Sequence, residues 1–235
     1  MDARHLSERL LKVAAYVPQA ARLADIGSDH AYLPAYLALN KRISYAVAGE
    51  IVKGPYLNTL HEIENEGLTK LVQVRHADGL AAIEDHDQID TITICGMGGP
   101  LIKKILEDGK DKLQAHPKLI LQPNVGAPQL RRWLGANGYQ LIAEEILEED
   151  QHIYEILVAQ YQPEQVLLDE LDYEFGPFLR REQSAPFLKK WQAEAFKIKR
   201  VLQQLKKAKE FPVEQQQRMQ QKIKQIEGVL NDQSA

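Results

Sequence analysis

The stretch LADIGSDHAYLP, residues 23–34, decides how the first part of this chain folds. A short apolar run ends at Asp25, one glycine follows at Gly27, and a second apolar run begins after His30. Apolar runs separated by a glycine turn are typical of a strand that leads into a helix. A dinucleotide-binding loop would carry further glycines, whereas this loop carries Asp29. The stretch therefore predicts a strand–turn–helix unit whose ligand is not a dinucleotide.

The chain as a whole has the composition of an ordinary globular protein. Its 235 residues are 44% hydrophobic and 26% charged, and Cys95 is the single cysteine. One cysteine excludes an intramolecular disulfide and a cysteine-rich zinc cluster, so we expect no metal and a cytoplasmic location. Charges interrupt the N-terminal apolar residues, and no apolar run has the length of a membrane span. We therefore expect neither a signal peptide nor a membrane partner.

Strand-like and helix-like runs alternate along the first two thirds of the chain. Strands are expected at residues 21–27, 43–50, 71–78, 91–98 and 118–124, and helices at 6–17, 31–40, 55–67, 100–109 and 127–138. Nearly continuous apolar strands that alternate with helices predict a doubly wound, parallel α/β sheet. Two more strands, 139–150 and 152–161, are too close for a crossover and predict an antiparallel last hairpin. Its acidic segment, residues 144–150, is expected to be a solvated strand edge and turn.

The pattern becomes helical after residue 161. Within residues 164–182 a helix is expected until Gly176 and Pro177, and further helices are expected over residues 185–210 and 212–231. The last two each carry an apolar stripe that predicts a coiled-coil hairpin with a turn at Phe211 and Pro212. We expect an α/β domain over residues 1–161 and a helical domain over residues 162–235. Residues 180–224 carry a net charge of +9, against −13 for the rest of the chain. This asymmetry favours a polyanionic partner for the helices.

Polar residues gather where the expected strands end, which is where doubly wound sheets bind ligands. Glu50 ends the second strand and is expected to accept hydrogen bonds from the hydroxyls of a ribose. Asp78, followed by Gly79, is expected to accept from an adenine amine, with Ile51 beside the base. Together these residues predict a site for an adenosine-containing ligand.

The segment CGMGGP, residues 95–100, ends the fourth expected strand. Its glycines allow the backbone to approach a ligand closely, and Cys95 is interpreted as a small core residue. Asp29 would repel the phosphates of NAD or FAD. A ligand with an adenosine and a cationic group fits better, and S-adenosylmethionine, with its sulfonium and ammonium groups, is such a ligand.

These motifs together resemble the bacterial tRNA adenine-22 N1-methyltransferases, the TrmK family. The resemblance rests on DIGSDHAYLP, AGEIVKGPY, HADGL, CGMGG and LQPN, in that order. It implies a Rossmann-like class I methyltransferase fold, S-adenosylmethionine as methyl donor and tRNA as acceptor. The general class I fingerprint has more glycines in its first loop, where this chain has Asp29 and Ala31.

The resemblance also implies roles for individual residues. It places Asp25, Gly27, Asp29 and His30 at the methionine end of the cofactor. Methylation at N1 gives a cationic base, which needs a field that tolerates positive charge, and Asp29 is also the candidate for this role, with His30 orienting it. Whether Asp29 acts mainly on the cofactor or on the methylated base stays open. Asp29 and His30 are the expected catalytic pair. The residues expected to bind the cofactor are Asp25, Gly27, Ser28, Glu50, Ile51, Asp78, Gly79, Gly96, Met97 and Gly98.

The basic helices are expected to contact tRNA phosphates. The expected contacts are Arg180, Arg181, Lys189, Lys190, Lys197, Lys199 and Arg200. We expect a monomer, with a homodimer as the alternative. Two other functions stay open at this point: a small-molecule methyltransferase that uses its helices to dimerise, and a non-catalytic RNA-binding protein.

Reversing several of these basic charges should weaken tRNA binding and leave cofactor affinity nearly unchanged, because these residues are expected to contact tRNA phosphates and not the cofactor. Filter binding of tRNA and calorimetry of the cofactor measure the two effects separately. A parallel loss of cofactor binding would contradict the assignment.

Overall fold

The computed structural model describes residues 2–164, 166, 168–205 and 213–232. They form two compact units. The first comprises Met1–Glu145 with Tyr154–Leu167, and the second comprises Ile146–Ile153 with Leu168–Ala235. The tip of the last strand pair therefore belongs with the C-terminal helices, whereas the start of the first of these strands and the end of the second belong to the first unit.

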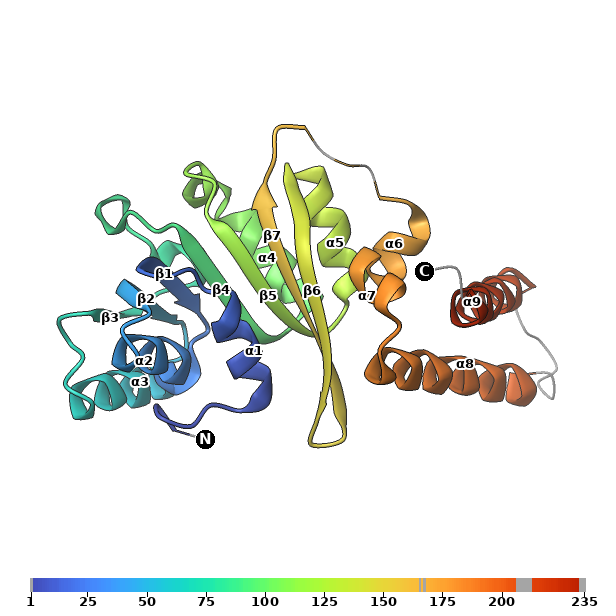
Figure 1. Cartoon of the computed structure of the whole chain (residues 1–235), viewed down its shortest axis with the longest axis horizontal. Helices are drawn as coiled ribbons and strands as arrows, with labels where there is room; N and C mark the ends of the chain where they lie inside the picture. The colour runs from blue at the N-terminus through green and yellow to red at the C-terminus, as the bar shows by residue number, and fades with distance from the viewer. Residues whose placement is uncertain (1, 165, 167, 206–212, 233–235) are drawn as a thin grey trace. The chain divides into compact units, whose positions relative to one another are not determined.

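The first unit is built on a seven-stranded sheet of order β3-β2-β1-β4-β5-β7-β6 (Figure 1). Strands β1 to β5 pair in parallel, and β7 pairs antiparallel to β5. The strands are β1 (Ala21–Ile26), β2 (Ile43–Glu50), β3 (Val72–His76), β4 (Thr91–Gly98), β5 (Lys118–Val125), β6 (Tyr139–Glu149) and β7 (His152–Tyr161). The predicted Rossmann-like sheet with an antiparallel end is confirmed.

Helices cover both faces of this sheet (Figure 1). Those on one face are α1 (Glu8–Tyr16), α2 (Tyr32–Leu39) and α3 (Lys53–Asn65), and those on the other are α4 (Gly99–Asp108) and α5 (Ala127–Ala136). Leu23, Ala24, Ile92 and Ile94 in the central strands are fully buried, which explains why these strands are apolar on both faces. None of the described helices combines the length and the apolar character needed to cross a bilayer.

A buried cluster of three charges lies between α5 and the last two strands. The Arg131 guanidinium donates to Glu144 Oε1 at 2.7 Å and to Glu155 Oε2 at 2.6 Å. All three side chains are at most 4% exposed. The expectation that residues 144–150 form a solvated edge is therefore wrong at Glu144, whose charge is compensated by an arginine from a helix.

The second unit contains four helices, of which the first begins later than predicted. They are α6 (Glu170–Phe175), α7 (Pro177–Glu182), α8 (Ala185–Leu205) and α9 (Val213–Asn231). Residues 164–169 are not helical where they are described, because Asp169 caps α6 by accepting from the Asp172 N–H at 2.6 Å. Gly176, at φ +87°, then separates α6 from α7.

Helices α8 and α9 pack together around an apolar core. That core also includes Ile146 from the hairpin tip, and its buried members are Ile146, Phe175, Leu179, Phe187, Trp191, Ala195, Ile226 and Val229. Phe187, Trp191 and Ala195 of the apolar stripe of α8 lie in this core, whereas Val213 in α9 is 65% exposed. The predicted turn at Phe211 and Pro212 lies outside the described residues, so the coiled-coil hairpin stays a prediction.

Replacing Arg131 by methionine should lower the free energy of unfolding by about 3–5 kcal/mol, because two buried carboxylates lose their shared partner. Arg132→Met is the matched control, since Arg132 is exposed on the same helix. Urea denaturation followed by circular dichroism measures both. Equal losses in the two variants would contradict the role given to the buried cluster.

Candidate functional site

The strand register brings the predicted site residues to one edge of the sheet. Ile26, at the end of β1, lies between Gly49 of β2 and Ile94 of β4. The backbone N–H groups of Gly27 and Ser28 donate to the Gly49 carbonyl at 2.9 and 3.3 Å. The loop after β1 is thus tied to the end of β2, and the ends of β1, β2 and β4 lie side by side.

This loop has an unusual backbone. Gly27 has φ +69°, and Asp29, His30 and Ala31 follow with φ values of +24°, +64° and +53°. Left-handed backbone is costly for residues with a Cβ and is found mainly where the surroundings enforce it. Here the Asp29 N–H donates to Glu50 Oε1 at 2.8 Å. The side chain that ends β2 therefore helps to hold the loop in its strained conformation.

Asp25 lies beneath the loop and is 4% exposed. Its carboxylate accepts from Ser28 Oγ at 2.5 Å and from Thr93 Oγ1 at 2.6 Å. Burial raises the pKa of Asp25 to about 6, and the nearby Glu50 charge adds to the rise, while the two hydroxyl hydrogen bonds oppose it. Asp25 thus fastens β1, its loop and β4 to one another, and Thr93 is a supporting residue that the sequence did not single out.

The two predicted catalytic side chains lie on the outside of the loop. The Asp29 side chain is 77% exposed, and the His30 side chain is 38% exposed. His30 Nε2 lies 3.8 Å from Asp29 Oδ1, and the His30 ring stacks on Tyr32 at 5.2 Å between centroids. The carboxylate and the imidazole are therefore close enough to interact and are open to a ligand.

The residues predicted to meet adenine line a pocket of 510 Å³. Ile51, Asp78 and Gly79 form part of its wall, and Leu101 and Ile105 of α4 contribute apolar surface. A Cβ on Gly79 would lie 3.1 Å from the Ile105 side chain, and Gly79 has φ +53°, so the backbone there needs glycine. The sequence analysis missed the α4 residues, although the apolar stripe of that helix was a signal for them.

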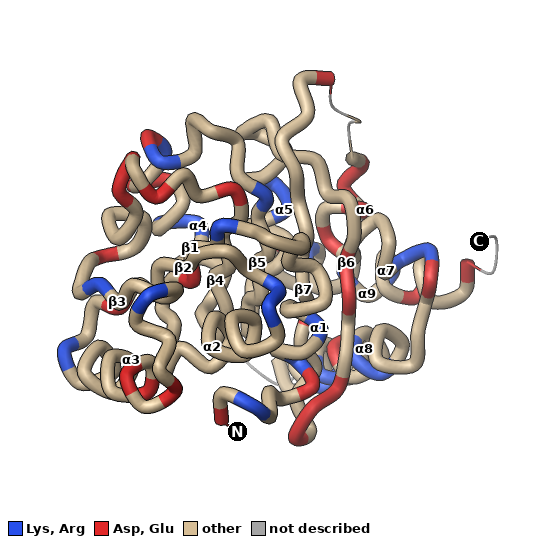
Figure 2. The backbone as a smooth tube through the Cα atoms, turned by 60° about the vertical axis from the view of Figure 1, so that its left-hand side comes forward, with Lys and Arg blue, Asp and Glu red and all other residues tan. Residues whose placement is uncertain are grey.

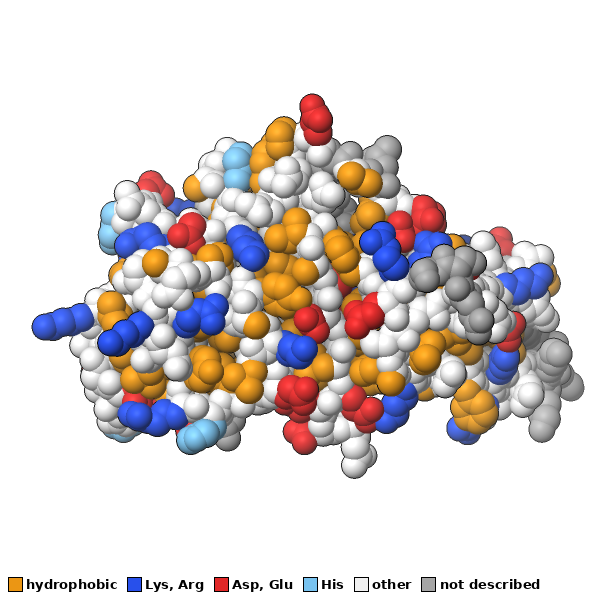
Figure 3. Space-filling view, in the orientation of Figure 1, with side chains coloured by type: hydrophobic (Ala, Val, Ile, Leu, Met, Phe, Trp, Pro, Cys, Tyr) orange, Lys and Arg blue, Asp and Glu red, His pale blue; other side chains and the backbone are white. Residues whose placement is uncertain are grey.

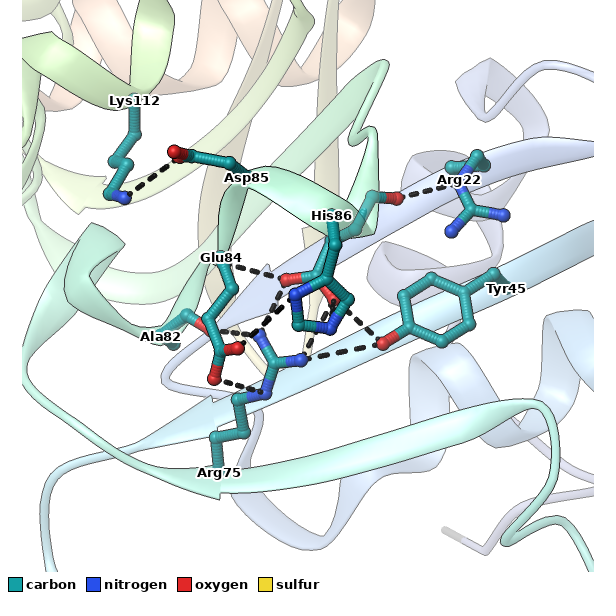
Figure 4. A network of polar contacts seen from close by, with 9 residues as sticks. Arg22, Tyr45, Arg75, Ala82, Glu84, Asp85, His86 and Lys112 are labelled. Atoms are coloured by element: carbon teal, nitrogen blue, oxygen red, sulfur yellow. Dashed lines mark hydrogen bonds and ion pairs between the residues drawn. The ribbon is translucent and has the colours of Figure 1, made fainter.

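A polar network holds the connection between β3 and β4, which carries Asp78 and Gly79 (Figure 4). At its centre, Asp87 accepts two hydrogen bonds from Arg75, at 2.5 and 2.8 Å, and one from Tyr45 at 2.8 Å. Burial opposes the ionised carboxylate, but hydrogen bonds from Arg75, the Glu84 N–H and Tyr45 hold the pKa of Asp87 below its ordinary value. The network therefore anchors residues 82–87, which directly follow the pocket-lining residues 78–81.

The glycine-rich end of β4 approaches two other segments closely. A Cβ on Gly27 would overlap Cε of Met97, so the first loop and the end of β4 are in contact. A Cβ on Gly99 would lie 2.5 Å from the carbonyl oxygen of Gly126, at the start of α5. Burial raises the pKa of the Cys95 thiol, but the residue is only partly buried, so its interpretation as a core residue stays a prediction.

Gly96 forms an irregularity in β4, with φ +77° and a shift in the pairing with β5. Gln122 Oε1 accepts from the Gly96 N–H at 2.9 Å, and Asn124 Nδ2 donates to the Gly96 carbonyl at 2.7 Å. The Arg9 guanidinium of α1 also donates to Gln122 Oε1. Bulges are common beside functional sites, and this one is held by side chains from two other elements.

The predicted phosphate-binding residues all lie in the second unit. Arg180 pairs with Asp172 at 2.9 Å, Lys189 with Glu148 at 2.5 Å, and Lys199 with Glu227 at 2.6 Å. The other four are Arg181 and Lys197, which are exposed, Lys190, which lies over the Trp191 ring, and Arg200, which lies over the Phe196 ring. Acidic residues therefore lie among the basic residues of this unit, as the red and blue colouring of Figures 2 and 3 shows.

Comparison with known proteins gives consistent matches. A family model described as tRNA (adenine(22)-N(1))-methyltransferase, TrmK, matches residues 23–228. Over 212 residues the chain is 47% identical to the tRNA (adenine(22)-N(1))-methyltransferase of Bacillus subtilis strain 168, which covers 88% of this chain and 89% of that protein.

Two solved structures are similar over nearly the whole chain. Sp1610 of Streptococcus pneumoniae, in complex with S-adenosyl-L-methionine, has 46% identity and a TM-score of 0.89 over 97% of this chain and 100% of that one. The Bacillus subtilis m1A22 tRNA methyltransferase TrmK has 42% identity and a TM-score of 0.90, with the same coverage.

The pKa of Asp25 gives a pH-dependent stability. The pKa of this carboxyl rises from 3.8 to about 6 on folding, so between these pH values the folded chain binds more protons than the unfolded chain does. The free energy of unfolding should therefore fall by about 3 kcal/mol as the pH rises from about 4 to about 6. Asp25→Asn should remove this fall, whereas Glu64→Gln, an exposed control, should keep it. Urea midpoints between pH 4 and pH 7.5 measure the difference. Parallel curves for wild type and Asp25→Asn would contradict the role of burial.

Proposed function

This chain belongs to the tRNA (adenine(22)-N(1))-methyltransferase family, TrmK, and we propose that it methylates N1 of adenine 22 in tRNA with S-adenosylmethionine as donor. The observation that carries the proposal is the tie between Asp29 and Glu50, at 2.8 Å, at the strand ends. This hydrogen bond joins a loop that lacks phosphate-binding features to the carboxylate that binds the ribose in this proposal.

The residues present fit this cofactor. Ile51 is 54% exposed beside the pocket and offers apolar surface to adenine, while Asp78 at the pocket wall accepts from the adenine amine. Glu50 keeps one carboxylate oxygen for the ribose hydroxyls, since its other oxygen accepts from Asp29. The remaining cofactor-binding residues of the proposal are Asp25, Gly27, Ser28, Gly79, Gly96, Met97 and Gly98.

Methyl transfer to N1 requires that the two reactants are correctly positioned and that the local electrostatic field stabilises positive charge. S-adenosylmethionine supplies an electrophilic methyl group on a sulfonium. Adenine N1 is a neutral lone pair that needs no base, and the methylated adenine is a cation. The exposed Asp29 carboxylate stabilises that charge, and His30, 3.8 Å away, orients the carboxylate. Because N1 lies on the Watson–Crick edge, the target base enters unpaired or extruded.

We assign catalysis to the domain of residues 1–161 and tRNA contact to the helical domain of residues 162–235, with its α8–α9 coiled-coil hairpin. The phosphate contacts are Arg180, Arg181, Lys189, Lys190, Lys197, Lys199 and Arg200. Arginine and lysine side chains paired with surface carboxylates exchange these partners for phosphates at little cost, because exposed ion pairs are weak. We propose a monomer that acts in the cytoplasm without a metal.

The purified chain should form 1-methyladenosine in an unmodified tRNA transcript supplied with S-adenosylmethionine. Nucleoside mass spectrometry detects the product, and a reverse-transcription stop locates it. A transcript with guanine at position 22 is the control and should stay unmethylated. Methylation of small metabolites but not of tRNA, or binding of tRNA without methylation, would contradict the proposal and favour one of the two alternatives.

A further inference from the structure

Asn124 lies at the carboxyl end of β5, exposed, next to the irregular end of β4. Its Nδ2 donates to the Gly96 carbonyl at 2.7 Å, and its Oδ1 accepts from Gln122 Nε2 at 3.4 Å. Because a carbonyl oxygen only accepts, the contact with Gly96 fixes which end of the amide faces it. Asn124 therefore presents its side chain in one defined orientation.

The residue that holds Asn124 is itself held firmly. Gln122 is fully buried, and its Oε1 accepts from both the Gly96 N–H and the Arg9 guanidinium. A buried amide with three such contacts has no freedom to rotate. The N-terminal helix, β4 and β5 thus combine to keep an exposed asparagine beside the proposed transfer site.

The Asn124 amide has hydrogen-bonding capacity left for a ligand. A carboxamide carries two N–H donors and two oxygen lone pairs. Its contacts with described residues use one donor, to Gly96, and one lone pair, from Gln122. One donor and one acceptor remain, on adjacent atoms of a planar group.

Adenine offers the complementary pair on the edge that the reaction does not use. N1 must point at the methyl group, so recognition falls to N6–H and N7, a donor and an acceptor that an asparagine side chain pairs with bidentately. We propose that Asn124 binds the target adenine through N6 and N7. This inference rests on the proposed function. Guanine presents two acceptors, O6 and N7, at the same positions, so Asn124 selects adenine.

The test compares tRNA transcripts that carry adenine or 7-deazaadenine at position 22. The analogue keeps N1 and N6 but lacks the N7 acceptor. For the wild-type chain, kcat/KM should fall about 3- to 10-fold with the analogue, the value of one neutral hydrogen bond. Asn124→Ala should lose about 10- to 100-fold on adenine and show less than about a 2-fold further loss on the analogue. Asn65→Ala, an exposed asparagine on α3, is the matched control and should behave as wild type.

Asn124→Asp keeps the size of the side chain but lacks both N–H donors, the one to the Gly96 carbonyl and the one to N7, so it should also become insensitive to the analogue. Thermal unfolding of both variants, followed by circular dichroism, shows whether they fold as the wild type does. The inference is overturned, while the proposed function stands, if either variant still discriminates between the two transcripts as well as the wild type does, or if the wild type uses both transcripts equally. A wild-type chain inactive on the adenine transcript overturns the proposed function instead.

Discussion

The hydrogen bond from the Asp29 N–H to the Glu50 carboxylate, 2.8 Å long, is the interaction on which the site depends. It joins the loop after β1 to the end of β2 and accompanies a run of three left-handed residues that carry a Cβ. The strain is compensated by the surrounding contacts, in which Gly27 and Ser28 also donate to the Gly49 carbonyl. The exposed face of the loop is left free for the reaction.

Elsewhere in the first unit, hydrogen bonds between buried polar side chains also join separate segments of the chain. A buried charge is tolerated only with partners, so each such group fixes the segments that supply them. Asp25 joins β1 to β4 through Thr93, Asp87 joins the β3–β4 connection to β2 and β3, and Arg131 joins α5 to the last two strands. Three separate polar clusters therefore stiffen three connections of the first unit.

The sequence predicted the sheet and most of the ligand edge because apolar strands and their polar ends are local patterns. The positions of Glu50 and Asp78 at strand ends follow directly from these patterns. The sequence did not predict contacts between distant segments, such as the contact of Arg9 with Gln122 or of Arg131 with Glu144, since a charged residue in a strand pattern looks exposed until its partner is known. The late start of α6 was missed because the Asp169 cap competes with an otherwise helical pattern.

The most direct test of this account is calorimetric binding of S-adenosylmethionine to the wild type, Glu50→Gln and Glu50→Ala. Glutamine keeps an acceptor for the Asp29 N–H but lacks the charge that we propose binds the ribose, so the Kd of this variant should rise by about 10- to 100-fold. Alanine also releases the loop, and its Kd should rise further. Equal affinity in all three proteins would contradict the claim that Glu50 both shapes the loop and holds the cofactor.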